Sequence, residues 1–292
     1  MLPFKQISNI GTGLAAEANK RKGSRFVINP TFPIKATLSL IDRNGRASPR
    51  PGFRPATRPG FSTKAKGIAW KDWTATLVDL STTGANIHLN LAAVGFSDDL
   101  CQVKLSLGSF HLEIPGTVVH FRLFSHHAMC GLLFNFPDAE TQKAYLQLLE
   151  PVVIGTSLAP VEAKPDGTGL HKEQYAGKNS ALLTAWRQAP GGEMMSFDFR
   201  MNRYGVRWST GLAELMTYQL EEEKPASHKD RPRPVLKLKL KTPEKTEGIT
   251  PMLPLTEAQD EEVRWLFVLA VSNLSMSVAA DLRKFLISLV VA

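Results

Sequence analysis

The sequence predicts a mainly β protein with some α-helix: a six-stranded antiparallel β-barrel followed by a C-terminal α+β block that ends in a long helical region. Three observations support this prediction. Short segments with alternating apolar and polar residues recur between residues 32 and 136. An amphipathic helical pattern follows them, and a stretch rich in Gly, Pro, Lys, Thr and Ser then separates a second set of elements.

The barrel strands are expected where strand length, alternation and β-branched residues coincide. The segments that show this pattern are 32–40, 73–80, 84–89, 101–107, 109–124 and 129–136. Short turns separate most of them, which is typical of small antiparallel barrels. A helix is expected at 138–149, because Asp138 stands at a capping position and Tyr145, Leu146 and Leu149 are apolar at helical spacing.

The second half of the chain is expected to form a separate domain. Residues 155–179 have the composition of a linker, and residues 180–292 are expected to be an α+β output or oligomerisation domain. It contains a predicted hairpin at 195–209 and a predicted strand at 235–241. A capping box at Thr256 opens the final helical region. Its apolar stripe is explained either by core packing or by self-association, or contact with a protein partner, through the C-terminal helix.

Basic residues are concentrated in one insertion between the first two strands. The formal net charge of the 292-residue chain is +8, and residues 42–72 contain eight basic residues against two acidic ones. The density of proline there predicts an extended or disordered loop. Such a segment is either a solvated surface or a site for an anionic partner, which includes nucleic acid, a membrane surface or a nucleotide.

Several function classes receive no support from the sequence. Neither a nucleophile elbow, nor paired carboxylates, nor metal-ligand spacing of Cys and His stands out, so we expect no enzyme, no metal and no cofactor. Cys101 and Cys130 lie in apolar strands, which predicts buried free thiols and a reducing, cytoplasmic location. The longest uncharged apolar run, 265–280, is shorter than a bilayer requires, so no transmembrane segment is expected.

Two polar motifs flank the first predicted strands. In VDLSTTGANI, residues 78–87, the residues Asp79, Ser81 and Gly84 form the pattern D-x-S-x-x-G at a strand-to-strand corner. The alternative is an ordinary turn at the end of a strand, in which the side chains of Asp79 and Ser81 bond to the local backbone and Gly84 supplies a permissive dihedral angle. Arg21 and Arg25 form R-x-x-x-R immediately before the first barrel strand, after a helical or flexible arm at 1–20.

Taken together, this order resembles the PilZ domain family over residues 21–154, including a late strand with G-x-x-F from Gly131 to Phe134. Proteins of this family are typically bacterial receptors for the second messenger cyclic di-GMP. The resemblance implies a receptor that changes conformation and signals to a partner, with cyclic di-GMP as its ligand. The ligand contacts that it implies are Arg21, Arg25, Asp79, Ser81 and Gly84.

These residue types suit that ligand chemically. Arginine can fork onto phosphate oxygens, bond the O6/N7 edge of guanine and stack on its face. A carboxylate can accept from the N–H groups of the other guanine edge. Basic residues near the motif and in the insertion are candidates for additional phosphate contacts, namely Lys20, Lys22, Arg50, Arg54 and Arg58. Two alternatives stay open: a nucleic-acid-binding protein that uses the Arg-rich insertion, and a barrel that serves as a protein-interaction module without nucleotide.

Overall fold

The computed structural model describes residues 24–41, 70–108, 110–165, 167–212, 214–220, 252–253 and 255–291. The chain forms two compact units. The first comprises the described residues up to Ser157 and those from Val268 onward, and the second comprises those from Leu158 to Phe267. The arm at 1–20, most of the basic insertion and the predicted strand at 235–241 lie outside the described residues.

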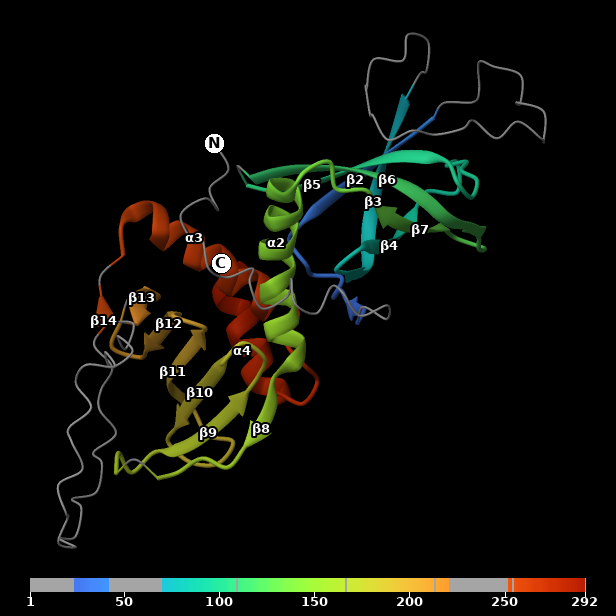
Figure 1. Cartoon of the computed structure of the whole chain (residues 1–292). Helices are drawn as coiled ribbons and strands as arrows, with labels where there is room; N and C mark the ends of the chain where they lie inside the picture. The colour runs from blue at the N-terminus through green and yellow to red at the C-terminus, as the bar shows by residue number, and fades with distance from the viewer. Residues whose placement is uncertain are drawn as a thin grey trace, which may run out of the picture. The chain divides into compact units, whose positions relative to one another are not determined.

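Six strands of the described residues close into an antiparallel barrel, as predicted, in the order β3, β2, β5, β6, β7, β4 and back to β3 (Figure 1). A short strand β1 (Phe26–Val27) pairs with the end of β3. The barrel strands are β2 (Lys35–Ile41), β3 (Trp70–Ser81), β4 (Gly84–Leu89), β5 (Leu100–Leu107), β6 (Phe110–Leu123) and β7 (Ala128–Phe134). Strand β3 begins at Trp70, so residues 70–72 of the predicted insertion belong to the barrel.

Apolar side chains from the strands fill the barrel interior, and the alternation is clearest in β5. In β5 the residues Cys101, Val103, Leu105 and Leu107 are buried, and the residues between them are partly exposed. Full burial of an aliphatic side chain contributes about 1.5–3 kcal/mol. The barrel interior also includes Leu38, Leu40, Ile87, Ile114 and Val118.

Helix α2 (Ala139–Ser157) follows the barrel and runs further than predicted. The backbone N–H of Thr141 donates to Oδ1 of Asp138 at 2.7 Å, which confirms the predicted cap. Beyond residue 149 the helix continues through Pro151, because the next three residues are apolar and buried. Their burial outweighs the roughly 3 kcal/mol that a proline costs inside a helix. The predicted linker at 155–179 is therefore wrong, since it contains the end of α2 and two strands.

The C-terminal helical region is two helices, α3 (Glu257–Val271) and α4 (Ala280–Val291), rather than one. The predicted capping box is confirmed, since the N–H of Thr256 donates to Oε1 of Gln259 at 3.1 Å. The break falls in a serine-rich stretch whose groups bond locally: Asn273 Nδ2 donates to the carbonyl of Leu269 at 3.1 Å. None of the described helices is both long and apolar enough to span a bilayer.

The last part of the chain belongs to the barrel unit, which corrects the prediction of residues 180–292 as one block. Gly155 of α2 explains the close fit inside this unit. A side chain at Gly155 would collide with the backbone carbonyl of Ala270, and the Gly155 carbonyl accepts from the N–H of Ser275 at 2.9 Å. Glycine thus lets α2 approach the last turn of α3 and the segment that follows it.

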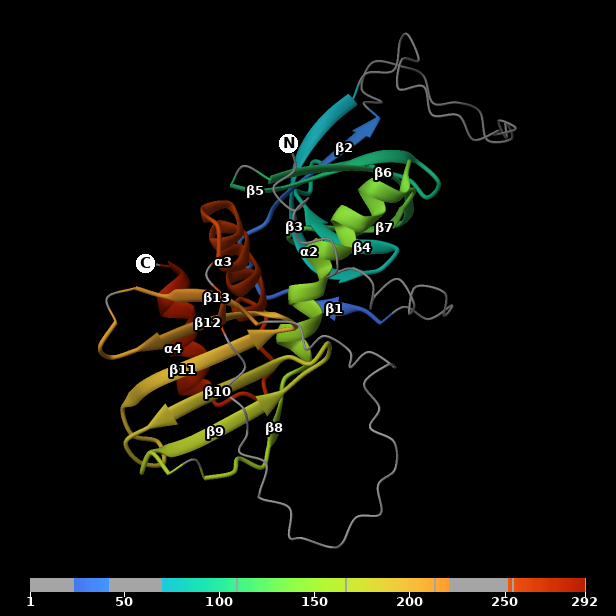
Figure 2. The same cartoon turned by 60° about the vertical axis from the view of Figure 1, so that its left-hand side comes forward.

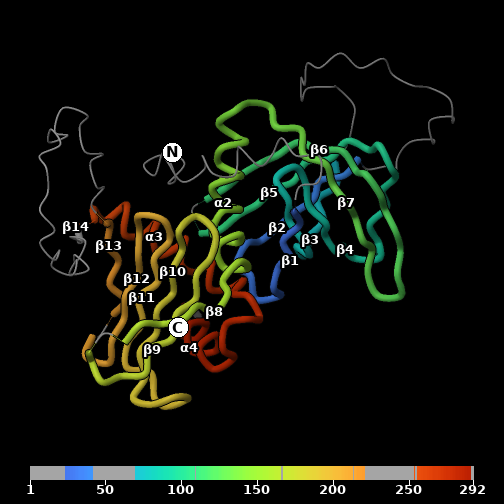
Figure 3. The backbone as a smooth tube through the Cα atoms, turned by 60° about the horizontal axis from the view of Figure 1, so that its bottom comes forward, coloured from blue at the N-terminus to red at the C-terminus, as the bar shows by residue number. Residues whose placement is uncertain are grey.

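The second unit contains a seven-stranded antiparallel sheet in which each strand pairs with the next one along the chain (Figures 2 and 3). Its strands are β8 (Ala159–Val161), β9 (His171–Ala176), β10 (Leu182–Arg187), β11 (Met194–Met201), β12 (Tyr204–Ser209), β13 (Met216–Leu220) and β14 (Met252–Leu253). The predicted hairpin is confirmed as β11 and β12, with Asn202 at φ 59° in the turn. The ring of Phe267 in α3 stacks on Phe197 of this sheet, with centroids 5.8 Å apart.

Candidate ligand-binding site

The β3–β4 corner holds the polar motif of the sequence. Asp79 pairs with Asn86 and Ser81 pairs with Gly84 across the two strands. A bulge between Leu77 and Asp79 interrupts the pairing, and such bulges turn neighbouring side chains toward a chosen direction. Because side chains on a strand alternate, Asp79 and Ser81 share one face of β3.

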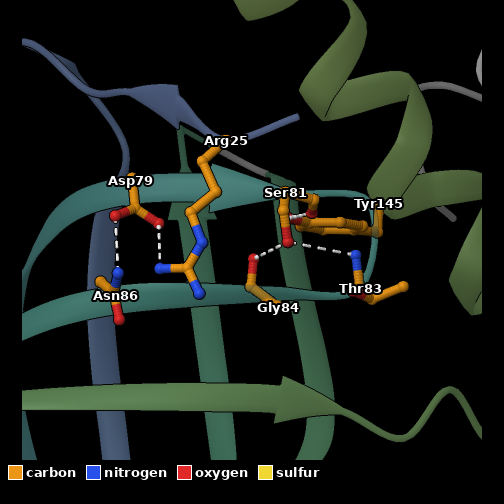
Figure 4. Close-up of polar contacts among 7 residues, drawn as sticks. All are labelled: Arg25, Asp79, Ser81, Thr83, Gly84, Asn86 and Tyr145. Carbon is orange, nitrogen blue, oxygen red and sulfur yellow. Dashed lines mark hydrogen bonds and ion pairs between the residues drawn. The ribbon is translucent and has the colours of Figure 1, made fainter. Parts of the chain in front are cut away.

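Asp79 lies between an amide and a guanidinium (Figure 4). Asn86 Nδ2 donates to Oδ2 of Asp79 at 2.6 Å. The other oxygen, Oδ1, lies 3.6 Å from Nη1 of Arg25, whose side chain is 62% exposed against 15% for Asp79. An ion pair this exposed contributes only about 0–1 kcal/mol, so Arg25 can leave Asp79 at little cost.

The side chain of Ser81 bonds to the backbone of the turn, as expected if the motif is an ordinary strand-end turn. Its hydroxyl donates to the carbonyl of Gly84 at 3.2 Å and accepts from the N–H of Thr83 at 3.4 Å. Its backbone carbonyl accepts from Tyr145 Oη of α2 at 2.6 Å (Figure 4). Burial raises the pKa of Tyr145 above its usual range, and the negative charge of Asp79 adds to the rise, so the phenol remains a neutral donor.

Gly84 is present for packing rather than for an unusual dihedral angle. Gly84 is not one of the described glycines that have a positive φ. A side chain at Gly84 would collide with the backbone carbonyl of Leu132 in β7. The interpretation of Gly84 as a permissive turn residue is therefore wrong, and its role is the close pairing of β4 with β7.

A pocket of about 120 Å³ lies at this corner. Four of the predicted ligand contacts line it: Arg25, Asp79, Ser81 and Gly84. Pockets that enclose a whole small molecule measure roughly 300–1,000 Å³, so this one accommodates part of a ligand, such as one base. The other predicted contacts lie outside the described residues, namely Arg21, Lys20, Lys22, Arg50, Arg54 and Arg58.

Three polar residues that sequence reasoning missed also line the pocket, namely Thr83, Asn86 and His120. Asn86 is 8% exposed and holds Asp79, and His120 reaches the pocket from β6. The signal for Asn86 was available, because it stands two residues after Gly84 on the same face of β4. No such signal was available for His120, because the position of its side chain depends on the pairing of β6 with β7. In the part of the chain that the structure describes, no group of three His, Cys, Asp or Glu residues is placed to hold a metal ion.

The fold defines a small antiparallel barrel domain with a closing helix and a polar pocket at one strand corner. A family model for the PilZ domain matches residues 44–150, which include β3 to β7 and most of α2. Over these residues the chain is therefore similar to the PilZ domain family. The match begins after Arg25. No curated protein matches the chain.

Proposed function

We propose that this protein is a non-enzymatic receptor that binds cyclic di-GMP at the β3–β4 corner and passes the binding event to a partner. The observation that carries the proposal is the pocket in which Arg25, Asp79, Ser81 and Gly84 meet, within a PilZ domain. The ligand is bound and released unchanged.

The chemistry of the pocket matches one guanine and its neighbouring phosphate. The carboxylate of Asp79 can accept from the N–H groups on the donor edge of guanine. The exposed guanidinium of Arg25 can bond the O6/N7 edge or fork onto a phosphate oxygen. Because Arg25 is bound only by a weak ion pair, its movement from Asp79 to the ligand requires little free energy.

Ligand binding would then order Arg25 and the start of β1. Arg25 stands one residue before Phe26, the first residue of β1, and β1 pairs with β3 at Asp79 and Leu80. Contacts from Arg25 to a phosphate therefore couple the ligand to this pairing. Such ordering shifts the population of conformers, which is the form of signal that a receptor without catalysis can pass on.

Titration calorimetry of the full chain with cyclic di-GMP tests the proposal. We expect micromolar or tighter binding to the natural sequence and its loss when both Arg21 and Arg25 are replaced by Ala, because charge-assisted bonds to phosphate are lost. The Arg122→Ala variant is the matched control, since Arg122 is an exposed barrel arginine that does not line the pocket. Its affinity should stay within about twofold of the natural sequence, a change of less than about 0.5 kcal/mol.

The alternatives give different results in the same assay. Binding to any DNA duplex that falls steeply with salt, without selectivity for the dinucleotide over GMP, would favour nucleic-acid binding through the basic insertion. A folded protein that binds neither would be a PilZ domain that acts as an interaction module. Unchanged affinity of the double variant would contradict the role of the two arginines.

A further inference from the structure

The polar side chains of the site form a row across neighbouring strands, and this row extends beyond the β3–β4 corner to β6. Asp79 pairs with Asn86, Asn86 pairs with Gly131 of β7, and Gly131 pairs with His120 of β6. Paired residues on neighbouring strands lie side by side on one face of a sheet. Asp79, Asn86 and His120 therefore stand in one line across the barrel, with a glycine in the remaining position.

Gly131 leaves the space that the His120 side chain occupies. A Cβ atom at Gly131 would collide with three atoms of the imidazole, Cε1, Nδ1 and Nε2. The ring therefore lies across the backbone of β7, in the position that a side chain of residue 131 would take. From there it lines the same pocket as Asp79 and Asn86.

A bulge in β6 sets the direction in which the His120 side chain points. The pairing of β6 with β7 shifts between Val118 and His120, so Val119 is the additional residue. Bulges re-aim the side chains that follow them. Val119 and Leu133 are both about half exposed and also line the pocket, so the ring lies beside an apolar wall.

Asn86 offers an unused hydrogen-bond acceptor in the same row. Its Nδ2 is occupied by Asp79, whereas its Oδ1 is buried and has no hydrogen-bond partner among the described residues. A buried acceptor without a partner is costly, and a ligand N–H can satisfy it.

We propose that His120 is a further ligand-binding residue, whose imidazole contacts the face or edge of the purine held by Asp79, while Asn86 Oδ1 accepts from an N–H of that base. This inference rests on the proposed function. It assigns the pocket to a base rather than to a phosphate, because its far side carries a ring, an amide oxygen and two apolar side chains. Arg25 then meets the phosphate.

A double-mutant cycle measures this contact directly. His120→Ala should weaken cyclic di-GMP binding about 5- to 150-fold, the range found when an aromatic partner of a nucleobase is removed. Gly131→Ala should weaken it similarly, because the added methyl group displaces the ring. In the His120→Ala background, Gly131→Ala should change affinity less than about twofold, since there is no ring left to displace.

The matched control is His111→Ala, because His111 lies on the same strand, is exposed and does not line the pocket. Melting temperatures identify any variant that fails to fold. An independent readout in the unsubstituted protein is the NMR signal of the His120 imidazole, assigned by its absence in His120→Ala. This signal should shift when cyclic di-GMP is added.

Each outcome decides the question. If the natural sequence binds and His120→Ala binds equally well, with no shift of the imidazole signal, the contact is absent and the proposed function stands. If Gly131→Ala weakens binding equally in both backgrounds, the glycine acts on the barrel and not through His120. If the natural sequence does not bind, the proposed function and this inference both fall.

Discussion

At the scale of the residue, the site depends on how firmly Asp79 is held. Asn86 donates to it at 2.6 Å, and a hydrogen bond to a charged group contributes about 1.5–3 kcal/mol. We predict that Asn86→Ala weakens cyclic di-GMP binding roughly tenfold or more, because Asp79 loses its fixed position. Folding stability should change by less, since the substitution also removes a buried oxygen without a partner.

Asn135→Ala is the control for this prediction. Asn135 Nδ2 donates to Thr117 Oγ1 at 3.0 Å on the same barrel, and Asn135 does not line the pocket. Calorimetry and urea unfolding of both variants separate affinity from stability. Equal affinities in the two variants would show that Asn86 does not position Asp79.

The two cysteines give a second test at this scale. Burial raises the pKa of Cys101 and of Cys130 to about 12, so almost no thiolate exists at pH 8. We predict that neither thiol reacts with an aromatic disulfide reagent at pH 8 in the folded protein, and that both react in denaturant. Rapid reaction of a native thiol would contradict the buried position of both side chains.

The sequence was sufficient to recognise the corner motif, but not to explain why each of its residues is required. Asp79, Ser81 and Gly84 were recognisable from their spacing, and Arg25 from its place before the first strand. The collision that requires Gly84 involves a strand almost fifty residues away, and the place of His120 depends on a bulge. Both are properties of strand register, which short-range spacing does not contain.

At the scale of the element, the side chain of Tyr145 connects α2 to the ligand corner. Tyr145 is fully buried, its hydroxyl donates to the Ser81 carbonyl at 2.6 Å, and its ring packs 5.0 Å from that of Phe134. We predict that Tyr145→Phe keeps this packing and destabilises the barrel by about 0.5–1.5 kcal/mol, the net contribution of one hydrogen bond. Urea unfolding measures the change.

The same substitution tests whether α2 responds to the ligand. With the hydrogen bond in place, cyclic di-GMP should slow amide exchange in the first turns of α2, and in Tyr145→Phe this protection should diminish. Tyr175→Phe is the control, because its hydroxyl donates to Glu173 at 3.2 Å in the other unit. Identical protection of α2 in the natural sequence and Tyr145→Phe would exclude this connection.

The elements themselves were predictable where a local pattern determines them. Strand β4 has the predicted bounds, and the helix caps at Asp138 and Thr256 were read correctly. The errors arose where tertiary packing overrides composition. The composition of residues 155–179 indicated a linker, but α2 continues through Pro151 to Ser157 because the three apolar residues after the proline are buried. Gly155 was counted as part of the linker, yet it lies where α2 contacts α3.

At the scale of the whole molecule, one buried acid makes stability depend on pH. Glu262 of α3 is 3% exposed, and neither of its carboxylate oxygens has a hydrogen-bond partner among the described residues. Burial raises its pKa from 4.5 to about 7. Between these pH values the folded protein retains a proton that the unfolded chain has lost, so stability decreases as the pH rises.

We therefore predict that Glu262→Gln stabilises the protein at high pH and not at low pH. Near pH 4.5 the two proteins should have similar stability, because the acid is neutral when folded. Above pH 7 the variant should be more stable by up to about 3 kcal/mol, at 1.36 kcal/mol for each unit of pKa difference. Urea unfolding followed by tryptophan fluorescence at pH 5, 6, 7 and 8 measures the difference. Other titrating groups are common to both proteins and cancel. A difference that stays constant across this range would mean that Glu262 is ionised throughout and is compensated by a partner on folding.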